Sequence, residues 1–304
     1  MSVTPEPAGA TEIGTASPAA VGARPSDARV AAKERLALLR RSKSFIAGSI
    51  IVGFFILCAI FGELVVPYDP LASDPINDLV APSADHWFGT DKLGRDVFSR
   101  VITGARDILI VAPLATILGT AVGTALGLVT GYFRGWVDDV LSRIIEAFLA
   151  LPALIMALLV VVAVGPSKIA MIVVIGGLFA PIISRTVRAA VLTERELEYV
   201  SAARLRNERT PYVLFGEILP NVMGPIIVEF TVRLGYAIFL AAGLSFLGFG
   251  IQPPAPDWGV QVAEHYGIIS GGFWWPVIFP SVAIALLVIG VNLIADGVAS
   301  VFER

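Results

Sequence analysis

The chain has 304 residues, of which 56% are hydrophobic and 15% are charged, and its formal net charge at pH 7 is -3. This charged fraction is well below the quarter typical of soluble domains, and apolar runs of about twenty residues recur, so the composition excludes a large soluble core and predicts an all-α, polytopic membrane protein. The single cysteine, Cys58, excludes an internal disulfide and a cysteine-rich metal site.

Residues 1–40 are predicted to form a cytoplasmic N-terminal tail. Roughly the first thirty are rich in Ala, Pro, Ser, Thr and Gly without an apolar period, which is typical of disorder, and Lys33–Lys43 is basic. Phe45–Val66 follows as the first predicted transmembrane helix. Arg40-Arg41 precedes this run as in a twin-arginine export signal, but the run is too long for a signal core and no small-residue cleavage site follows.

The first helix and the polar stretch after it form a predicted region at 41–106. Four prolines between residues 67 and 106 oppose a continuous helix. Six aspartates lie in the same stretch, yet their spacing does not match the alternating ligands of a calcium loop. We therefore expect an irregular extracytoplasmic segment and no metal site.

Residues 107–304 are predicted to form a five-helix core domain. Its expected spans are Ile108–Thr130, Val140–Val164 (broken by Pro152), Ile169 to about Ser184 (with a kink at Gly176-Gly177 and Pro181), Val222 to about Leu247, and Pro276–Ala295. Gly119, Gly123 and Gly127 recur every four residues, which places small residues on one helix face and predicts close contact with a second helix.

The distribution of basic residues predicts the topology. If the N-terminus is cytoplasmic, sixteen of the twenty-two Lys and Arg residues lie in cytoplasmic segments and five lie in extracytoplasmic segments. The remaining one, Arg233, lies within a span. Six of the sixteen are arginines in the polar loop at about 185–221. The positive-inside bias therefore predicts six spans with both termini and this loop in the cytoplasm.

The sequence contains no pattern for covalent chemistry. It has no G-x-x-x-x-G-K-[ST] loop to hold ATP phosphates, no G-x-S-x-G elbow and no H-E-x-x-H zinc motif. His86 and His265 fall in separate outer loops and are expected to be ordinary loop histidines. The chain is thus predicted to be non-enzymatic and to bind no cofactor.

Four motifs in order resemble one family of transporters. They are Gly89-Thr90-Asp91-Lys92-Leu93-Gly94-Arg95-Asp96, Gly131-Tyr132-Phe133 with Gly135-Trp136, the run Leu244–Pro254 followed by Asp257-Trp258-Gly259, and Asn292-Leu293 with Asp296-Gly297. Together they resemble the permease subunits of binding-protein-dependent ABC importers, in particular the C-type permease of the dipeptide, oligopeptide and nickel branch. The resemblance covers about residues 40–300 and implies a type I importer fold in the inner or plasma membrane.

The resemblance implies that the polar loop is the segment that couples the permease to its ATPase subunits. The residues that match this segment are Tyr199, Val200, Ser201, Ala202, Ala203, Arg204, Leu205, Arg206, Asn207, Leu219 and Pro220. An amphipathic helix carrying Val200, Ala203 and Leu205 would bury one side in a groove on the ATPase. Ser201 replaces the usual Glu and Asn207 the usual Gly, and Asn still permits a left-handed turn.

The resemblance also implies the partners: a second homologous permease, two ATPase subunits that hold ATP and Mg, and an extracytoplasmic solute-binding protein, with no nucleic acid. The outer motif residues Gly89, Thr90, Asp91, Gly94, Arg95 and Asp96 are expected to contact the binding protein or the sister permease. Peptides lead as solute, with glutathione, nickel complexes and haem as alternatives.

Glu229 and Arg233 lie within the fifth predicted span and are four residues apart, so they can pair on one helix face. Charges at such depth face a bundle interior or a wet cavity. They are expected either to line the translocation path or to form a structural pair. A stand-alone secondary transporter or channel is the alternative function, because such carriers place acids deep in spans; a membrane enzyme is a third class.

Overall fold

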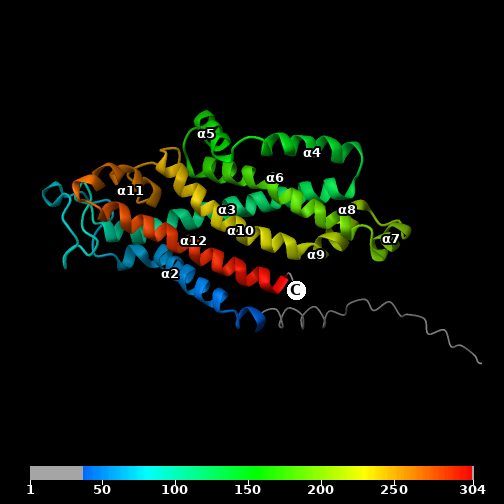
Figure 1. Ribbon diagram of the computed structural model, residues 1–304, viewed down its shortest axis with the longest axis horizontal. Coiled ribbons are helices and arrows are strands. Elements are labelled where there is room, and N and C mark those ends of the chain that lie inside the picture. The colour runs from blue at the N-terminus through cyan, green and yellow to red at the C-terminus, as the bar shows by residue number, and fades with distance from the viewer. Residues whose placement is uncertain (1–36, 303–304) are drawn as a thin grey trace, which may run out of the picture. The chain divides into compact units, whose positions relative to one another are not determined.

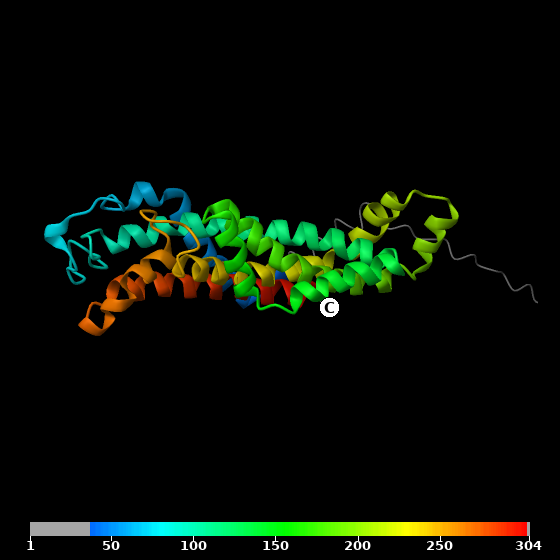
Figure 2. The same cartoon turned by 90° about the horizontal axis from the view of Figure 1, so that it is seen from above.

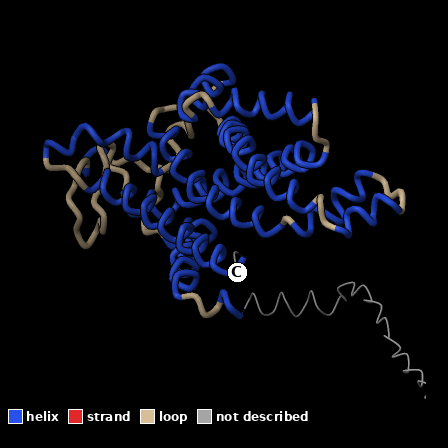
Figure 3. The backbone as a smooth tube through the Cα atoms, turned by 45° about the vertical axis from the view of Figure 1, so that its right-hand side comes forward, coloured by secondary structure: helices blue, strands red, loops and turns tan. Residues whose placement is uncertain are grey.

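The computed structural model describes residues 37–302. The chain divides into two units, Met1–Leu38 and Leu39–Arg304, and the architecture below concerns the second; the predicted tail at 1–40 lies almost wholly outside the described residues. Between residues 37 and 302 the chain is helical with loops and forms no β-strand, apart from one isolated bridge between Thr90 and Asp96 (Figure 3).

Five continuous helices are long and apolar enough to cross a bilayer. They are α2 (Lys43–Val65), α3 (Val97–Tyr132), α6 (Lys168–Glu194), α10 (Met223–Phe246) and α12 (Trp275–Phe302), seen side by side in Figure 1. Three, α3, α6 and α12, extend well beyond their predicted bounds, and α12 continues seven residues past the predicted end at Ala295. The start of α3 is fixed by Asp96, whose carboxylate accepts a hydrogen bond from Ser99 N, and α6 continues through Arg185 and Arg188 into the predicted polar loop.

The third predicted span is not one helix. It consists of α4 (Trp136–Leu149) and α5 (Ala153–Val164), which are bent by 90° at the break. Pro152 has no N–H to donate and disfavours helical geometry at Leu151, so the helix ends there. Six spans are therefore present only if this bent pair counts as one. By contrast, Pro181 lies inside α6 without interrupting it.

The helices α3 and α6 form the most extensive helix contact among residues 37–302, and the predicted glycine stripe lies in it. A Cβ atom at Gly123 would lie 2.7 Å from the carbonyl oxygen of Ala180, and one at Gly119 would lie 2.8 Å from that of Gly176. Only a hydrogen atom fits in this space, so the backbones approach closely along this stripe. The prediction of a close helix contact is confirmed.

Two polar regions lie at opposite ends of the bundle in Figures 1 and 2. One end carries α7 (Glu198–Leu205) and the short helices after it. The other carries residues 67–96, with a 3-10 turn η1 (Pro75–Asn77), next to α11 (Trp258–His265) and the 3-10 turn η3 (Tyr266–Gly271). The spans thus connect two separate polar regions.

Candidate coupling segment, intramembrane ion pair and outer module

The segment between α6 and α10 is mostly helical. After α7 the chain forms α8 (Thr210–Tyr212), a π-helical stretch η2 (Val213–Ile218) and α9 (Leu219–Asn221), which leads into α10. The predicted loop at 185–221 therefore narrows to 195–221, here called the coupling segment. A π-helical stretch is rare and is often found at functional positions, and this one lies directly before Leu219 and Pro220.

The helix α7 packs its apolar side against its own chain. Val200 and Ala203 are fully buried and belong to the same core cluster as Val213 and Ile218, whereas Leu205 is 84% exposed. Residues three apart share a helix face, but Leu205 is two residues beyond Ala203 and points elsewhere. The predicted common docking face of Val200, Ala203 and Leu205 is therefore wrong, because two of its members pack internally.

The turn after α7 has the geometry expected of the family's glycine. Asn207 adopts φ 58°. Its backbone N–H donates to the carbonyl of Arg204 at 2.9 Å, and that of Glu208 donates to the carbonyl of Ala203 at 3.2 Å. This pair of backbone hydrogen bonds is a Schellman motif. Its left-handed position is occupied most often by Gly and next by Asn. The prediction of a left-handed turn at Asn207 is confirmed.

Polar side chains fix the coupling segment to the spans. Arg195 Nη1 donates to the carbonyl oxygen of Tyr132 at 2.6 Å, and the Arg204 guanidinium lies 4.9 Å from the centre of the Tyr132 ring. Tyr199 Oη donates to Glu194 at 2.7 Å and accepts from Asn221 Nδ2 at 3.1 Å. Burial, and then Glu194, raise the pKa of Tyr199 above its ordinary value, so the phenol stays protonated.

Much of the segment between Ser201 and Tyr212 is exposed. Six of the exposed residues from α7 to α8 form what we call the outward face: Ser201, Ala202, Leu205, Arg206, Arg209 and Tyr212. Ser201, which stands where the family has Glu, belongs to this face. Arg206 pairs with Glu208 at 2.8 Å, which raises the pKa of the guanidinium.

The intramembrane pair is formed on α10. Arg233 Nε donates to Glu229 Oε2 at 2.9 Å, and each side chain is 18% exposed. Thr186 Oγ1 on α6 donates to the other carboxylate oxygen of Glu229 at 2.9 Å, and the Arg233 guanidinium lies 5.4 Å from the centre of the Tyr236 ring. The predicted pairing is confirmed, and Thr186 is an additional partner that spacing within one span could not reveal.

The outer motif is an internal scaffold. Asp91 accepts hydrogen bonds from Leu93 N, Arg95 N and Arg95 Nε at 2.8, 3.0 and 2.6 Å, and Arg95 Nη2 donates to Glu264 of α11 at 2.8 Å. The Thr90 carbonyl accepts from Trp275 Nε1 at 2.9 Å. Residues 67–96 together with α11 are here called the outer module.

All six residues predicted to contact a partner here are buried: Gly89, Thr90, Asp91, Gly94, Arg95 and Asp96. Gly94 has φ 70°, and a side chain there would clash with the carbonyl of Asp74. The predicted direct contact through these six side chains is therefore wrong, because each is enclosed by its own chain. The exposed residues of the motif are Lys92 and Leu93.

The two histidines, predicted to be ordinary residues of separate outer loops, both belong to the outer module, and the loop prediction is wrong for His265, which is buried at the end of α11. His86 Nδ1 lies 2.9 Å from Asp96 Oδ1, and His265 Nε2 lies 3.9 Å from Asp91 Oδ2. Burial lowers the pKa of His265, which favours its neutral form. Within residues 37–302 no three His, Cys, Asp or Glu side chains are grouped to hold a metal ion.

Comparison with known proteins matches the chain to two family profiles. Residues 123–304 match the binding-protein-dependent transport system inner membrane component, and residues 33–82 match the N-terminal transmembrane domain of oligopeptide transport permease C. The chain belongs to the family of binding-protein-dependent transport system inner membrane components. It is a multi-pass membrane permease, as the four motifs predicted.

Relatives of this permease align along most of its length. The dipeptide transport system permease protein DppC of Alkalihalophilus pseudofirmus is 40% identical over 89% of both chains. The protein of the same name in Bacillus subtilis is 37% identical over 87% of this chain and 83% of its own. The glutathione transport system permease protein GsiD of Salmonella typhimurium is 40% identical over 87% of each.

Proposed function

We propose that this permease is the C-type subunit of an ATP-driven importer and forms half of a translocation path for peptides. The names of its relatives support dipeptides or short peptides as the solute class, and one name supports glutathione. Nickel complexes and haem remain alternatives within the branch. A second permease, two ATPase subunits that hold ATP and Mg, and an extracytoplasmic binding protein would complete the importer. This chain itself would carry out no chemistry.

The observation that carries this proposal is the construction of the coupling segment. Its buried side is fixed to the spans through Arg195 and Tyr132 at the end of α3 and through Tyr199 and Asn221 near the start of α10. Its outward face presents Leu205 together with Arg206 and Arg209, which suits a groove with acidic rims on an ATPase. A displacement of the segment on ATP binding would therefore move α3 and α10 together.

We further propose that Glu229 and Arg233 line the path. Each side chain keeps part of its surface open on α10, and a solute with charged termini could exchange partners with the pair. The outer module would shape the outer mouth and contact the binding protein through its exposed residues, such as Lys92 and Leu93. A stand-alone carrier is not favoured by the family match.

The coupling role is tested by Leu205→Glu. Because Leu205 is exposed, the variant should insert and fold normally, while the added carboxylate in an apolar groove opposes docking. We expect the ATPase subunits to be lost on purification and solute-stimulated ATP hydrolysis to fall at least tenfold. Leu71→Glu is the matched control for retention of the ATPase subunits, since Leu71 is a half-exposed leucine in the outer module, at the other end of the spans. Parent-level ATPase retention and hydrolysis in Leu205→Glu would refute the docking role.

The solute class is tested separately with the partner binding protein. Its affinity for dipeptides, longer peptides, glutathione, nickel chelates and haem would be measured by calorimetry. The proposal expects tight binding of peptides. Retention of nickel complexes or haem alone would overturn the peptide assignment and leave the coupling role intact.

A further inference from the structure

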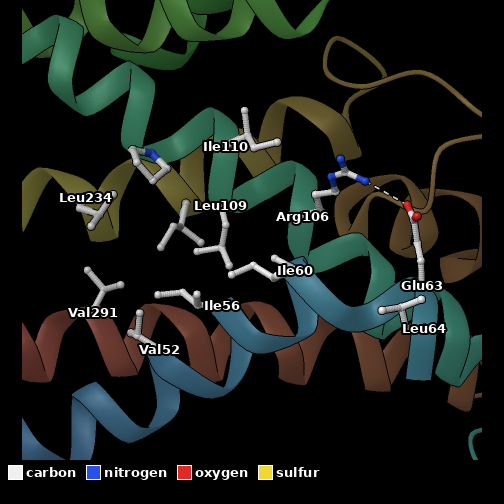
Figure 4. Close-up of a pocket in the computed structure, with 13 residues that line it drawn as sticks. Val52, Ile56, Ile60, Glu63, Leu64, Arg106, Leu109, Ile110, Leu234 and Val291 are labelled. Carbon is white, nitrogen blue, oxygen red and sulfur yellow. Dashed lines mark hydrogen bonds and ion pairs between the residues drawn. The ribbon is translucent and has the colours of Figure 1, made fainter. Parts of the chain in front are cut away.

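A groove lies between four of the spans, and neither Glu229 nor Arg233 lines it. It has a volume of about 800 Å³ and is formed by α2, α3, α10 and α12. Its walls are largely aliphatic: Ile56 and Ile60 from α2 line it together with Leu109 and Ile110 from α3, and Leu109 points toward Ile60 (Figure 4). Ile56 and Ile60 are 43% and 64% exposed, so the groove is open at the surface of this chain.

One end of this groove carries opposite charges. Arg106 Nη1 on α3 donates to Glu63 Oε1 on α2 at 3.0 Å (Figure 4), and the two side chains are 59% and 72% exposed. This contact engages one oxygen of Glu63 and one nitrogen of Arg106. The second oxygen and the other guanidinium nitrogens remain open to a further partner.

The charged end lies at the level of lipid headgroups. Glu63 is two residues from the end of α2, a helix of 23 residues that rises roughly 34 Å, close to the thickness of the hydrocarbon core. The aliphatic part of the groove therefore extends from the headgroup level into the acyl region of the same leaflet. A phospholipid with its chain along the groove would place its headgroup beside Glu63 and Arg106.

The charges favour one type of headgroup. A guanidinium binds a phosphate through directed hydrogen bonds, and a carboxylate binds a primary ammonium in the same way. A trimethylammonium has no N–H to donate, and a glycerol headgroup has no positive charge for Glu63. A transmembrane helix from a partner subunit would instead cover both charged groups with apolar surface, which is unfavourable.

We propose that this groove binds a phospholipid with a primary-amine headgroup, such as phosphatidylethanolamine, with its phosphate on Arg106 and its ammonium on Glu63. The bound lipid would fill the space between α2 and the core helices. It would thereby fix the position of the first span against α3 and α10.

The test uses the full-length permease, with the subunits that co-purify with it, in nanodiscs of mixed phospholipids. Trace phosphatidylethanolamine or phosphatidylcholine with a photoreactive acyl chain is activated, and labelled peptides are mapped by mass spectrometry. We expect peptides of α2 and α3 around the groove to be labelled about threefold to fivefold more by the ethanolamine lipid, the ratio that a partly exposed charge contact supports.

Three variants separate the headgroup from the groove. Glu63→Gln should remove the preference for the ethanolamine lipid while leaving labelling by both lipids. Ile60→Trp should fill the groove and reduce labelling by both, whereas Ile50→Trp should not, because Ile50 is an exposed residue of α2 (68%) outside the groove. These substitutions lie on the lipid-facing surface, and size-exclusion profiles would confirm that each variant folds.

Two results would overturn the proposal. Equal labelling by both lipids in the parent protein would show that the charged end selects no headgroup. Efficient crosslinking of an Ile60→Cys variant to a second permease, without lipid label at the groove, would show that a protein helix occupies it instead.

Discussion

Glu229 has two hydrogen-bonding partners on different helices, Arg233 on α10 and Thr186 on α6. Substitution of the pair tests whether it lines the path or only supports the structure. Glu229→Gln removes the negative charge that pairs with Arg233 beside Tyr236, while its amide oxygen can still accept the hydrogen bond from Thr186. We predict that Glu229→Gln and Arg233→Gln assemble normally but change uptake, with opposite effects on solutes of opposite charge. An unpaired charge at this depth costs at least about 2.5 kcal/mol unless water or solute reaches it.

The measurement is uptake of acidic, neutral and basic dipeptides by proteoliposomes containing each variant and the double variant. If the pair were only structural, both single variants would fail to assemble and the double variant would recover assembly and uptake. That pattern would contradict a role in the path.

Two nearby positions on α7 are predicted to respond differently to the same substitution. Ala203 is fully buried against the η2 stretch, so Ala203→Glu places an unpaired charge in a packed contact and should destabilise the coupling segment by several kcal/mol. Ser201 is exposed, so Ser201→Glu, which restores the family's usual residue, should leave the fold unchanged.

Thermal unfolding of the purified permease and retention of the ATPase subunits check this pair. Ala203→Glu should lower both, while Ser201→Glu should keep the melting temperature and retain at least as much ATPase. Equal melting temperatures for the two variants would contradict the burial of Ala203.

At the scale of elements, the contact between α3 and α6 offers a direct test of close packing. Alanine is normally preferred over glycine inside a helix by about 1 kcal/mol. At Gly123, however, the added methyl group would lie 2.7 Å from the Ala180 carbonyl, whereas at Gly177 it would meet nothing within 4 Å. We predict that Gly123→Ala lowers the free energy of unfolding by about 1–3 kcal/mol and that Gly177→Ala is neutral or stabilising.

Thermal unfolding in one detergent, with both variants compared to the parent, measures the difference. A melting temperature for Gly123→Ala at or above that of Gly177→Ala would show that α3 and α6 are free to separate.

Most elements could be predicted because span length and periodicity are local properties of the sequence. Five apolar runs became continuous helices, and Asn207 formed the turn that its residue type allows. The right-angle bend between α4 and α5 could be located at Pro152, but not its size, because the bend also depends on how α4 packs. The helix α4 is held against α6 by Asp138, whose carboxylate accepts two hydrogen bonds from Arg188 of α6 at 2.7 and 2.6 Å.

The site residues that the sequence did not reveal all make contacts distant in the chain. Glu264 and Arg95 are 169 residues apart, and Thr186 and Glu229 are 43 apart. Contacts between distant parts of the chain also explain why the predicted docking face on α7 was wrong. Hydrophobic spacing showed that Val200 and Ala203 belong to a buried face, but it could not show that the covering surface is the chain's own η2 stretch.

At the scale of the whole molecule, the outer module brings together two segments that are distant in the sequence, residues 67–96 and α11, and connects them to the spans. Residues 89–96 contact α11 through Glu264 and α12 through Trp275, and Trp258 of α11 donates to the Val101 carbonyl of α3 at 2.8 Å. Burial raises the pKa of Asp257, which caps α11, to about 6. Deleting residues 74–85 would remove the backbone partners of Asp91 and Thr90 and would dismantle the module rather than test its role.

A single substitution tests whether the module must stay docked for transport. The Glu264 side chain is 28% exposed and pairs with Arg95. Glu264→Gln removes the negative charge of this pair, while Arg95 keeps Asp91 as its partner. The loss of a charge-assisted hydrogen bond of about 1.5 kcal/mol should raise the undocked population of residues 89–96 about tenfold. Trypsin cleavage after the exposed Lys92 should accelerate by up to that factor, and uptake should fall. Basal ATP hydrolysis should stay at the parent level, because the coupling segment lies at the other end of the spans.

Asp85→Asn is the control, since Asp85 is exposed in the same module and only its backbone oxygen is engaged, by Tyr68. Faster cleavage in Glu264→Gln with unchanged uptake would show that the module tethers the first span without shaping the entrance.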